Sequence, residues 1–222
     1  MTNARIAGFT YLFYIAVALP CMFLMSRATN AEGTLAKLAI VAQHAIDVRL
    51  TILLTLLSCF SAIVLGIALY GVTRDEDHEL SLMAMAFRVS EGVLGAIGIP
   101  NLLGLLWVST SGAGPAATDP VTTSTLGAYF LMPAQDAMIG APFFAAGSLI
   151  FSFLLLRGRM IPSWLAWLGI IASALVVVAS PLQIAGFIKG PFTSLMWLPM
   201  LAFEVPLGLW LLIKGVAKPT SL

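Results

Sequence analysis

Three ionisable residues lie in segments that are otherwise apolar enough for the interior of a lipid bilayer. Arg88 and Glu91 fall in "SLMAMAFRVSEGVLGAIGIPNLLGLLWV" (81–108), and Glu204 falls in "SLMWLPMLAFEVPLGLWLLI" (194–213). A spacing of three residues places Arg88 and Glu91 on one face of a helix, where they are expected to pair. A charged side chain at the centre of a bilayer costs about 2.5 kcal/mol or more. Each of the three must therefore face protein or water.

Two carboxyl groups and one guanidinium in one layer leave at least one carboxyl without a counter-charge, and we expect that carboxyl to be protonated. A neutral carboxylic acid in an apolar pocket can serve as a general acid or as a proton carrier. We interpret Glu91 and Glu204 as a candidate catalytic acid and base, with Arg88 tuning their charge.

A purely structural role is the alternative, because buried Arg–Glu clusters also tie helices together and set their register. This alternative has equal weight for Arg88 and Glu91. For Glu204 a functional role is favoured, because Pro206 lies two residues after it. Proline leaves the carbonyl four residues earlier unpaired and bends a helix.

The composition identifies the kind of molecule that must hold these residues. Of 222 residues, 60% are hydrophobic and 9% are charged, against about 45–50% and about 25% in soluble domains. The chain is therefore expected to be a polytopic membrane protein with the lipid bilayer as its main partner. A net charge of +1 indicates no basic surface for nucleic acid. His44 and His78 lie in different connecting segments and no nucleotide or metal motif occurs, so we expect no metal and no cofactor.

A helix needs about 20 apolar residues to cross the hydrocarbon, and six segments qualify. They are 7–25, 50–72, 81–108, a part of 125–156, 163–187 and 194–213. The apolar core of the first is longer than the 7–15 residues typical of a signal peptide, so we expect it to be retained. The predicted fold is all-α, with residues 1–222 forming a single transmembrane domain.

Basic residues predict the orientation of the bundle, because they favour cytoplasmic loops. With the N-terminus inside, the inner side holds Arg5, Arg74, Arg157, Arg159, Lys214 and Lys218, and the outer side holds Arg27, Lys37, Arg49 and Lys189. We expect an N-in, C-in, multi-pass protein of a cell membrane, in a bacterium the inner or plasma membrane. Residues 109–125 are expected to form a turn-rich loop without structure of its own. Apolar spacing over 34–49 predicts one interfacial helix that lies on the outer leaflet or caps the bundle.

Depth along the spans groups the polar residues into two layers. Glu91 lies ten residues after Ser81 and Glu204 ten before Lys214, so both are about 15 Å deep. Tyr14 falls in this layer and is a candidate for a hydrogen bond into the cluster. An outer layer contains Asn101, Gln135, Asp136, Gln183, His44, Asp47 and Arg49. The two layers predict a cavity that opens on the outer side and ends at the glutamates. The candidate substrate-binding residues are Tyr14, Asn101, Asp136, Gln183, His44 and Asp47.

The two glutamates share a local pattern, since residues 91–95 and 204–208 both read E-x-x-L-G. The two segments run in opposite directions, so a duplication of three helices would be inverted in the membrane. Inverted repeats with midplane sites are typical of transporters. The remainder of the two halves does not align, so the pattern is a hint.

Five features of the sequence are similar to a known pattern: "ARIAGFTYLFYI" (4–15), Arg49, "AMAFRVSEGVLG" (84–95), "LLLRGRMIPSWLAWLGI" (154–170) and "EVPLGLWLLIKGV" (204–216). In these features the chain resembles a bacterial integral-membrane family classified as a domain of unknown function. The resemblance spans nearly the whole chain and implies a bundle of six helices and no particular activity. Arg88, Glu91 and Glu204 occupy motif positions, whereas His44 and Asp136 do not.

Three functional hypotheses follow. The leading one is a membrane-embedded protein that binds or converts a hydrophobic small molecule, such as an isoprenoid or another lipid, for example an isomerase or cyclase that starts by protonation. The second is a small proton-coupled transporter or channel, which six short helices would form as a homodimer. The third is an accessory protein in which the polar cluster is purely structural.

Overall fold

The structure is a computed structural model that describes residues 2–111, 119–131 and 135–217, with the side chains of 120 and 135–138 left out. The described residues form helices and no strand, which confirms the all-α prediction. The helices are α1 (Asn3–Ala28), α2 (Thr34–Gln43), α3 (Ala45–Thr73), α4 (His78–Gly95), α5 (Gly98–Thr110), α6 (Pro120–Leu131), α7 (Gln135–Arg157), α8 (Ser163–Ile184), α9 (Phe192–Leu195) and α10 (Leu198–Ile213).

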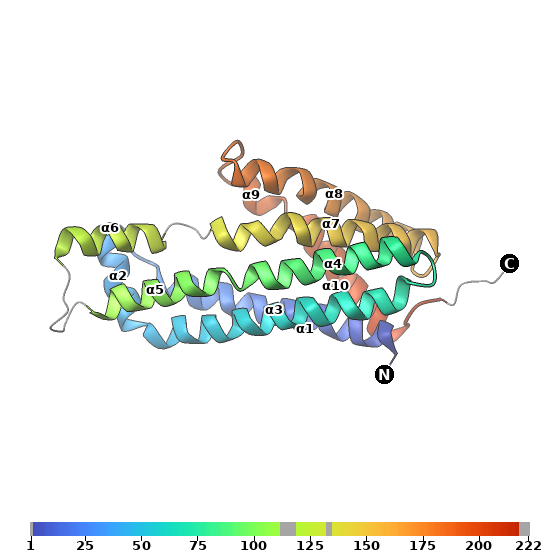
Figure 1. Cartoon of the computed structure of the whole chain (residues 1–222), viewed down its shortest axis with the longest axis horizontal. Helices are drawn as coiled ribbons and strands as arrows, with labels where there is room; N and C mark the ends of the chain where they lie inside the picture. The colour runs from blue at the N-terminus through green and yellow to red at the C-terminus, as the bar shows by residue number, and fades with distance from the viewer. Residues whose placement is uncertain (1, 112–118, 132–134, 218–222) are drawn as a thin grey trace.

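Six helical segments are long and apolar enough to cross a membrane, as the sequence predicts. They are Asn3–Ala28, Ala45–Thr73, His78–Thr110, Ile139–Arg157, Ser163–Ile184 and Phe192–Ile213. Large apolar side chains are exposed along their outer surfaces, as lipid-facing helices require. The chain is a multi-pass membrane protein. Both ends of the described chain lie at one end of the bundle, which we call the terminal end, and α2 and α6 lie at the opposite, far end (Figure 1). Which end faces the cytoplasm stays a prediction.

Two of the six spans are broken, which the sequence does not predict. The third divides into α4 and α5 at Ala96–Ile97, and the sixth divides into α9 and α10 at Met196–Trp197. The first break follows Glu91 and the second precedes Glu204. An inverted repeat would place the second break after its glutamate, so the shared E-x-x-L-G pattern is local.

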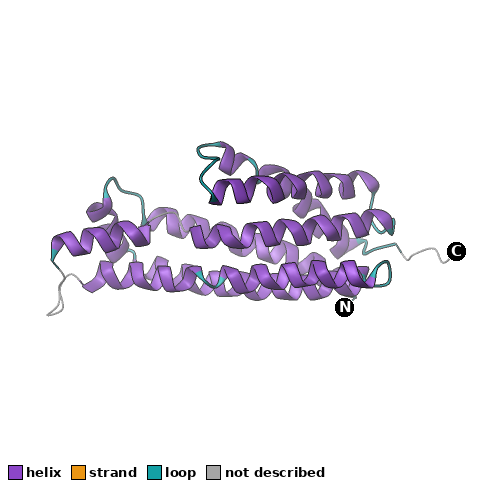
Figure 2. Ribbon diagram, turned by 45° about the horizontal axis from the view of Figure 1, so that its top comes forward, coloured by secondary structure: helices purple, strands orange, loops and turns teal. Residues whose placement is uncertain are grey.

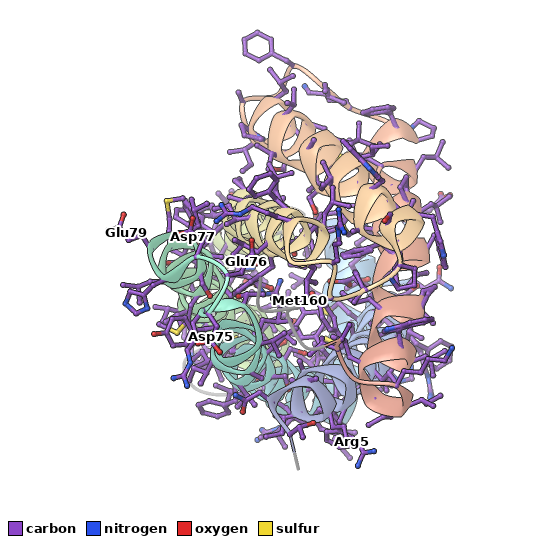
Figure 3. The ribbon with its side chains drawn as sticks, turned by 90° about the vertical axis from the view of Figure 1, so that its right-hand side faces the viewer. Arg5, Asp75, Glu76, Asp77, Glu79 and Met160 are labelled. Atoms are coloured by element: carbon purple, nitrogen blue, oxygen red, sulfur yellow. The ribbon has the colours of Figure 1, made fainter. Side chains whose placement is uncertain are left out.

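The six spans pack as a closed ring in chain order. α1 packs on α3, α3 on α4, α4 on α7, α7 on α8 and α8 on α10, and α10 closes the ring against α1. Seen from the terminal end, these helices surround an interior in which Met160, from the turn between α7 and α8, lies near the middle (Figure 3). Met160 is 2% exposed. The main hydrophobic core fills this ring and draws residues from all six spans.

Glycines allow the ring to close where α1 meets α10. A Cβ on Gly8 would lie 2.6 Å from the carbonyl oxygen of Gly208, and one on Gly208 would lie 3.1 Å from the Cβ of Tyr11. Small residues at such contacts let helix backbones approach closely in a membrane. This contact brings α1 and the glutamate-bearing helix α10 together.

The turns at the ends of α7 and α8 share one hydrogen-bond pattern but differ in one residue. At the end of α7 the amide of Met160 donates to the carbonyl of Leu155, and the amide of Arg159 donates to that of Leu156. The end of α8 has the same two bonds, with Gly186 in the place of Arg159. Both residues have positive φ, 50° at Arg159 and 81° at Gly186. Glycine adopts this conformation freely, whereas another residue loses about 1–2 kcal/mol.

A second, smaller core lies at the far end. It joins the end of α1 and the start of α3 to α2, α5 and α6 through Ala28, Leu38, Val41, Val48, Leu105, Leu106 and Val108. The span from His78 to Thr110 is 33 residues long. It extends about 50 Å, well beyond the roughly 30 Å of hydrocarbon. We call this assembly of α2, α5, α6, the end of α1 and the start of α3 the far-end cap. Figure 2 shows it as the end of the bundle away from the termini.

The far-end cap corrects two expectations. The predicted interfacial helix over 34–49 ends at Gln43, and residues from Ala45 onward begin the long helix α3 instead. The predicted loop 109–125 is helical in α6 from Pro120, while residues 112–118 lie outside the described chain. In both places helices stack on one another, because α2 packs against α5 and α6.

Candidate functional site

Arg88 of α4 is fully buried in the ring. Its Nη1 lies 2.9 Å from Oε2 of Glu91, and its guanidinium carbon lies 4.8 Å from the centre of the Phe144 ring on α7. Gly66 of α3 and Gly147 of α7 provide the space for its stem, since a Cβ on Gly66 would lie 2.8 Å from the Cβ of Arg88. The predicted pair is therefore present, enclosed by an aromatic ring and two glycines.

Glu91 also contacts α1. The hydroxyl of Tyr14 donates a hydrogen bond of 3.3 Å to its Oε1. The sequence predicts this bond from the shared depth of the two residues, and the structure contains it. Glu91 thus links α4 to α1 across the ring and holds Arg88 at the same time.

Glu204 projects from α10, which stands opposite α4 in the order of the ring. It is 6% exposed, and its Oε1 is buried without a hydrogen-bond partner among the described residues. The charges of Arg88 and Glu91 act on Glu204, although no hydrogen bond within the described chain joins the two glutamates. The ring thus holds one paired carboxylate and one carboxyl without a partner.

Buried hydroxyls continue this polar interior. Several Ser and Thr side chains in the spans donate to the carbonyl four residues earlier, as Ser61 does to Leu57. The hydroxyls of Ser148, Ser152 and Ser180 have no partner among the described residues, and neither has Oε1 of Gln183. Each such group costs about 1–3 kcal/mol if it stays unsatisfied. The interior beside α7 and α8 therefore suits water or a polar solute better than hydrocarbon.

The predicted outer-layer residues are held by local partners. Nδ1 of His44 lies 3.2 Å and Nε of Arg27 lies 3.6 Å from Oδ2 of Asp47. Asn101 donates to the carbonyl of Phe130 at 3.1 Å and so ties α5 to α6. Gln183 is half-buried near the end of α8. Asp136 lies in α7, but its side chain is outside the described residues.

His44 and Asp47 lie far from Arg88 and its partner Glu91. Asp47 and Gly66 are on the same helix, α3, and Gly66 touches Arg88. Their separation of 19 residues corresponds to about 28 Å of helix. A small molecule cannot touch both Asp47 and Arg88. His44 and Asp47 belong to the far-end cap, and a shared role in ligand binding stays a prediction.

Sequence reasoning missed four residues of the cluster. Phe144 faces Arg88 directly, and Gly66 and Gly147 admit its stem. The fourth is Tyr11, which is 1% exposed and is acted on by the charges of Arg88 and Glu204. A signal was available in α7, where Gly140 and Gly147 lie seven residues apart on the face towards α4.

One pocket described by the structure lies at the terminal end, away from the glutamates. Its volume is about 380 Å³, and it is lined by Arg159, Met160, Ile161, Pro162, Trp210, Lys214, Gly215, Val216 and Ala217. None of these belongs to the predicted site. The predicted cavity opening at the far end therefore stays a prediction.

An ion cluster closes the loop between α3 and α4 at the terminal end. Nε of Arg157 lies 2.7 Å from Oε1 of Glu76, and its Nη1 lies 3.1 Å from Oδ2 of Asp77. Oδ1 of Asp77 accepts the amide hydrogen of Leu80 at 3.1 Å and so caps α4. Figure 3 shows Glu76 and Asp77 beside the end of α7. The backbone amide of Leu80, and then Arg157, hold the pKa of Asp77 below its ordinary value of 3.8.

We expect the Asp77→Ala variant to be less stable than the wild type at neutral pH. The lowered pKa means that the ionised form of Asp77 stabilises the fold above the ordinary pKa of 3.8. That contribution is lost as the pH falls through the lower pKa of the folded state. Thermal unfolding measured from neutral pH down to below 3.8 should show the two proteins converging. Asp75→Ala is the control, because Asp75 is 79% exposed and caps no helix; an equal effect there would contradict the prediction.

We expect the Gly66→Ala variant to be destabilised by about 1–3 kcal/mol, the usual effect of overpacking. The added methyl would lie 2.8 Å from the Cβ of Arg88, which cannot move without shifting α4. Gly98→Ala is a matched control, since a Cβ there meets nothing within 4 Å. Reversible unfolding in mixed micelles would compare the two. Equal stabilities would show that α3 and α4 are not tightly packed at Arg88.

These features define a class: a polytopic α-helical membrane protein whose closed ring of six spans encloses an ion pair and a second carboxyl. The chain belongs to the family described as a domain of unknown function (DUF4386), whose model matches residues 6–215. The match covers nearly the whole chain and confirms the resemblance found in the sequence. No curated protein and no solved structure matches the chain.

Proposed function

We propose that the protein is a small proton-coupled transporter or channel in which Glu204 takes up and releases the proton. One observation carries the proposal: Oε1 of Glu204 is buried with neither a hydrogen bond nor an ion pair among the described residues. Oε2 of Glu91 accepts no hydrogen bond there either, but it lies 2.9 Å from Nη1 of Arg88 in an ion pair. A carboxyl in this position changes its protonation without breaking an ion pair. Proton pathways in membranes use such carboxyl groups.

The polar interior supports a route to Glu204. Ser152 of α7 and Phe203 of α10 both lie against Gly169 of α8. Phe203 directly precedes Glu204 in the chain, so Ser152 lies close to Glu204. Ser180 and Gln183 follow along α8 towards its C-terminal end, and both carry a buried oxygen without a partner in the described chain. Water satisfies groups of this kind. A file of water along α8 would connect Glu204 with the C-terminal end of α8.

The Arg88–Glu91 pair has a separate part in the proposal. It is fixed by Tyr14 and by the Phe144 ring, so it supplies a permanent, nearly neutral dipole opposite Glu204. Because Arg88 and Glu91 neutralise each other, the pair keeps its charge state while Glu204 gains or loses a proton.

A second candidate is the binding or conversion of a hydrophobic small molecule, such as an isoprenoid or another lipid, with Glu204 as the acid. The apolar surroundings favour it, since Tyr11, Met200, Phe203 and Leu207 all belong to the main core. The buried hydroxyls argue against it, because hydrocarbon would leave them unsatisfied. The pocket of about 380 Å³ lies elsewhere. Geranylgeraniol is a suitable probe: a rise in the thermal midpoint that Glu204→Gln removes would favour this candidate.

Infrared difference spectroscopy of the full chain in lipid films tests the proposal directly. Perfusion with buffers of rising pH should remove a carboxylic acid band, and perfusion with heavy water should shift that band within minutes. Glu204→Gln should abolish the band, and Glu79→Gln, at the exposed terminal end, should leave it unchanged. A band that neither titrates nor exchanges would identify Glu204 as a sealed structural acid and would refute the proposal. Light scattering of the same preparation would test the predicted homodimer.

A further inference from the structure

The pocket at the terminal end has a basic and apolar lining. Two of its nine lining residues, Arg159 and Lys214, are cations, and none is a carboxylate. The wall is a defined structure, because the amide of Ala217 donates to the carbonyl of Met160 at 3.1 Å and closes the chain after α10 over the turn after α7. The pocket is therefore an open, positively charged depression with a defined wall.

Both cations are available to a ligand. Arg157, two residues earlier, is neutralised by Glu76 and Asp77. Arg159 and Lys214 are exposed and form no ion pair with any residue in the described part of the chain. Nζ of Lys214 lies 4.3 Å from the centre of the Trp210 ring, which holds it beside the pocket. Two unpaired cations from different helices thus converge on one cavity.

The backbone of Arg159 is evidence that its side chain has a role. Among the described residues, Arg159 is the non-glycine residue with positive φ, and the same turn after α8 uses Gly186. A glycine at 159 would fit the turn better than arginine. Strained positions of this kind cluster at functional sites. The strain is therefore evidence for a use of the guanidinium that the turn itself does not require.

The pocket lies where two of the apolar spans end. Arg157 and Ile213 end the spans of α7 and α10, and the cations follow immediately. Trp164 and Trp167 are exposed at the start of α8, and tryptophan is enriched where the hydrocarbon meets the headgroups. Basic pockets between spans at this level are suited to anionic headgroups.

We propose that this pocket binds a phosphate group, held by Arg159 and Lys214, with the rest of the ligand resting on Trp210 and Ile161. Its depth favours the phosphodiester of an anionic phospholipid over a free phosphate. The proposal is independent of proton transfer at Glu204, since the two sites share no residue.

Native mass spectrometry of the full chain, titrated with phosphatidylglycerol or phosphatidylcholine, tests the proposal. The wild type should bind phosphatidylglycerol more tightly. Arg159→Gly and Lys214→Gln should each weaken that binding by about fivefold and leave phosphatidylcholine unchanged. Arg5→Gln is the matched control, because Arg5 is exposed at the same end outside the pocket. Arg159→Gly should be at least as thermostable as the wild type, which separates lost binding from lost folding.

A second arm distinguishes the source of the phosphate. Inorganic phosphate that raises the thermal midpoint in phosphatidylcholine, without any preference for phosphatidylglycerol, would assign the site to a soluble phosphate compound. A preference for phosphatidylglycerol that is lost in Arg159→Gly would assign it to lipid. The proposal is overturned if the wild type shows neither response, or if Arg159→Gly and Lys214→Gln respond as the wild type does.

Discussion

The Arg88→Met variant is expected to lose about 3–5 kcal/mol of its free energy of unfolding, the usual effect of breaking a buried ion pair. Arg88 is fully buried, and its removal leaves Glu91 at 7% exposure without a counter-charge. The contact with the Phe144 ring is lost as well. Reversible unfolding in mixed micelles, monitored by tryptophan fluorescence, measures the loss.

A double-mutant cycle separates charge from packing. Arg88→Met combined with Glu91→Gln removes both charges, so most of the lost stability should return. Tyr14 still has an acceptor in the glutamine, which preserves the link between α4 and α1. If the double variant is as unstable as Arg88→Met alone, the stem of the arginine between Gly66 and Gly147 matters more than its charge.

The Glu204→Gln variant is expected to fold normally and to lose proton transfer. The amide matches the carboxyl in size, and Oε1 of Glu204 has no partner among the described residues that the change would disturb. In liposomes with a trapped pH-sensitive dye, the proton flux after a pH step should fall by at least about tenfold, down to the passive leak. The thermal midpoint should change little.

Two comparisons make this result interpretable. Glu79→Gln removes an exposed carboxyl at the terminal end and should retain the wild-type flux. Glu91→Gln disturbs the ion pair and should reduce stability and flux together. A Glu204→Gln protein with undiminished flux would contradict a proton pathway through Glu204 and would favour the structural role of the cluster.

The fold was predictable where the apolar length of one segment, or the spacing and depth of residues along a helix, was sufficient. Apolar length alone locates the six spans, since each exceeds what the hydrocarbon needs. The spacing of Arg88 and Glu91 predicts their pair, and the common depth of Tyr14 and Glu91 predicts their hydrogen bond. These inferences need only the pitch of a helix and the thickness of a membrane.

The remainder depends on how helices are rotated and stacked, which depth does not reveal. Phe144 meets Arg88 only because α7 is the neighbour of α4 in the ring. The chain from Pro120 reads as a loop because threonine and serine dominate it, yet it is helical where it packs on α2 and α5. The distance from Asp47 to Arg88 likewise depends on the length and packing of α3, which runs from Ala45 to Thr73.

The depth of Glu204 has an electrical consequence. It stands near the middle of the span Phe192–Ile213, so a proton that reaches it from one side crosses about half of the membrane voltage. A full crossing is worth about 2.3 kcal/mol per 100 mV, and half of that is about 1.2 kcal/mol. Protonation of Glu204 from one side should therefore change about sevenfold for every 100 mV. A membrane potential of about 100 mV would thus change the protonation of Glu204 as strongly as a change of nearly one pH unit.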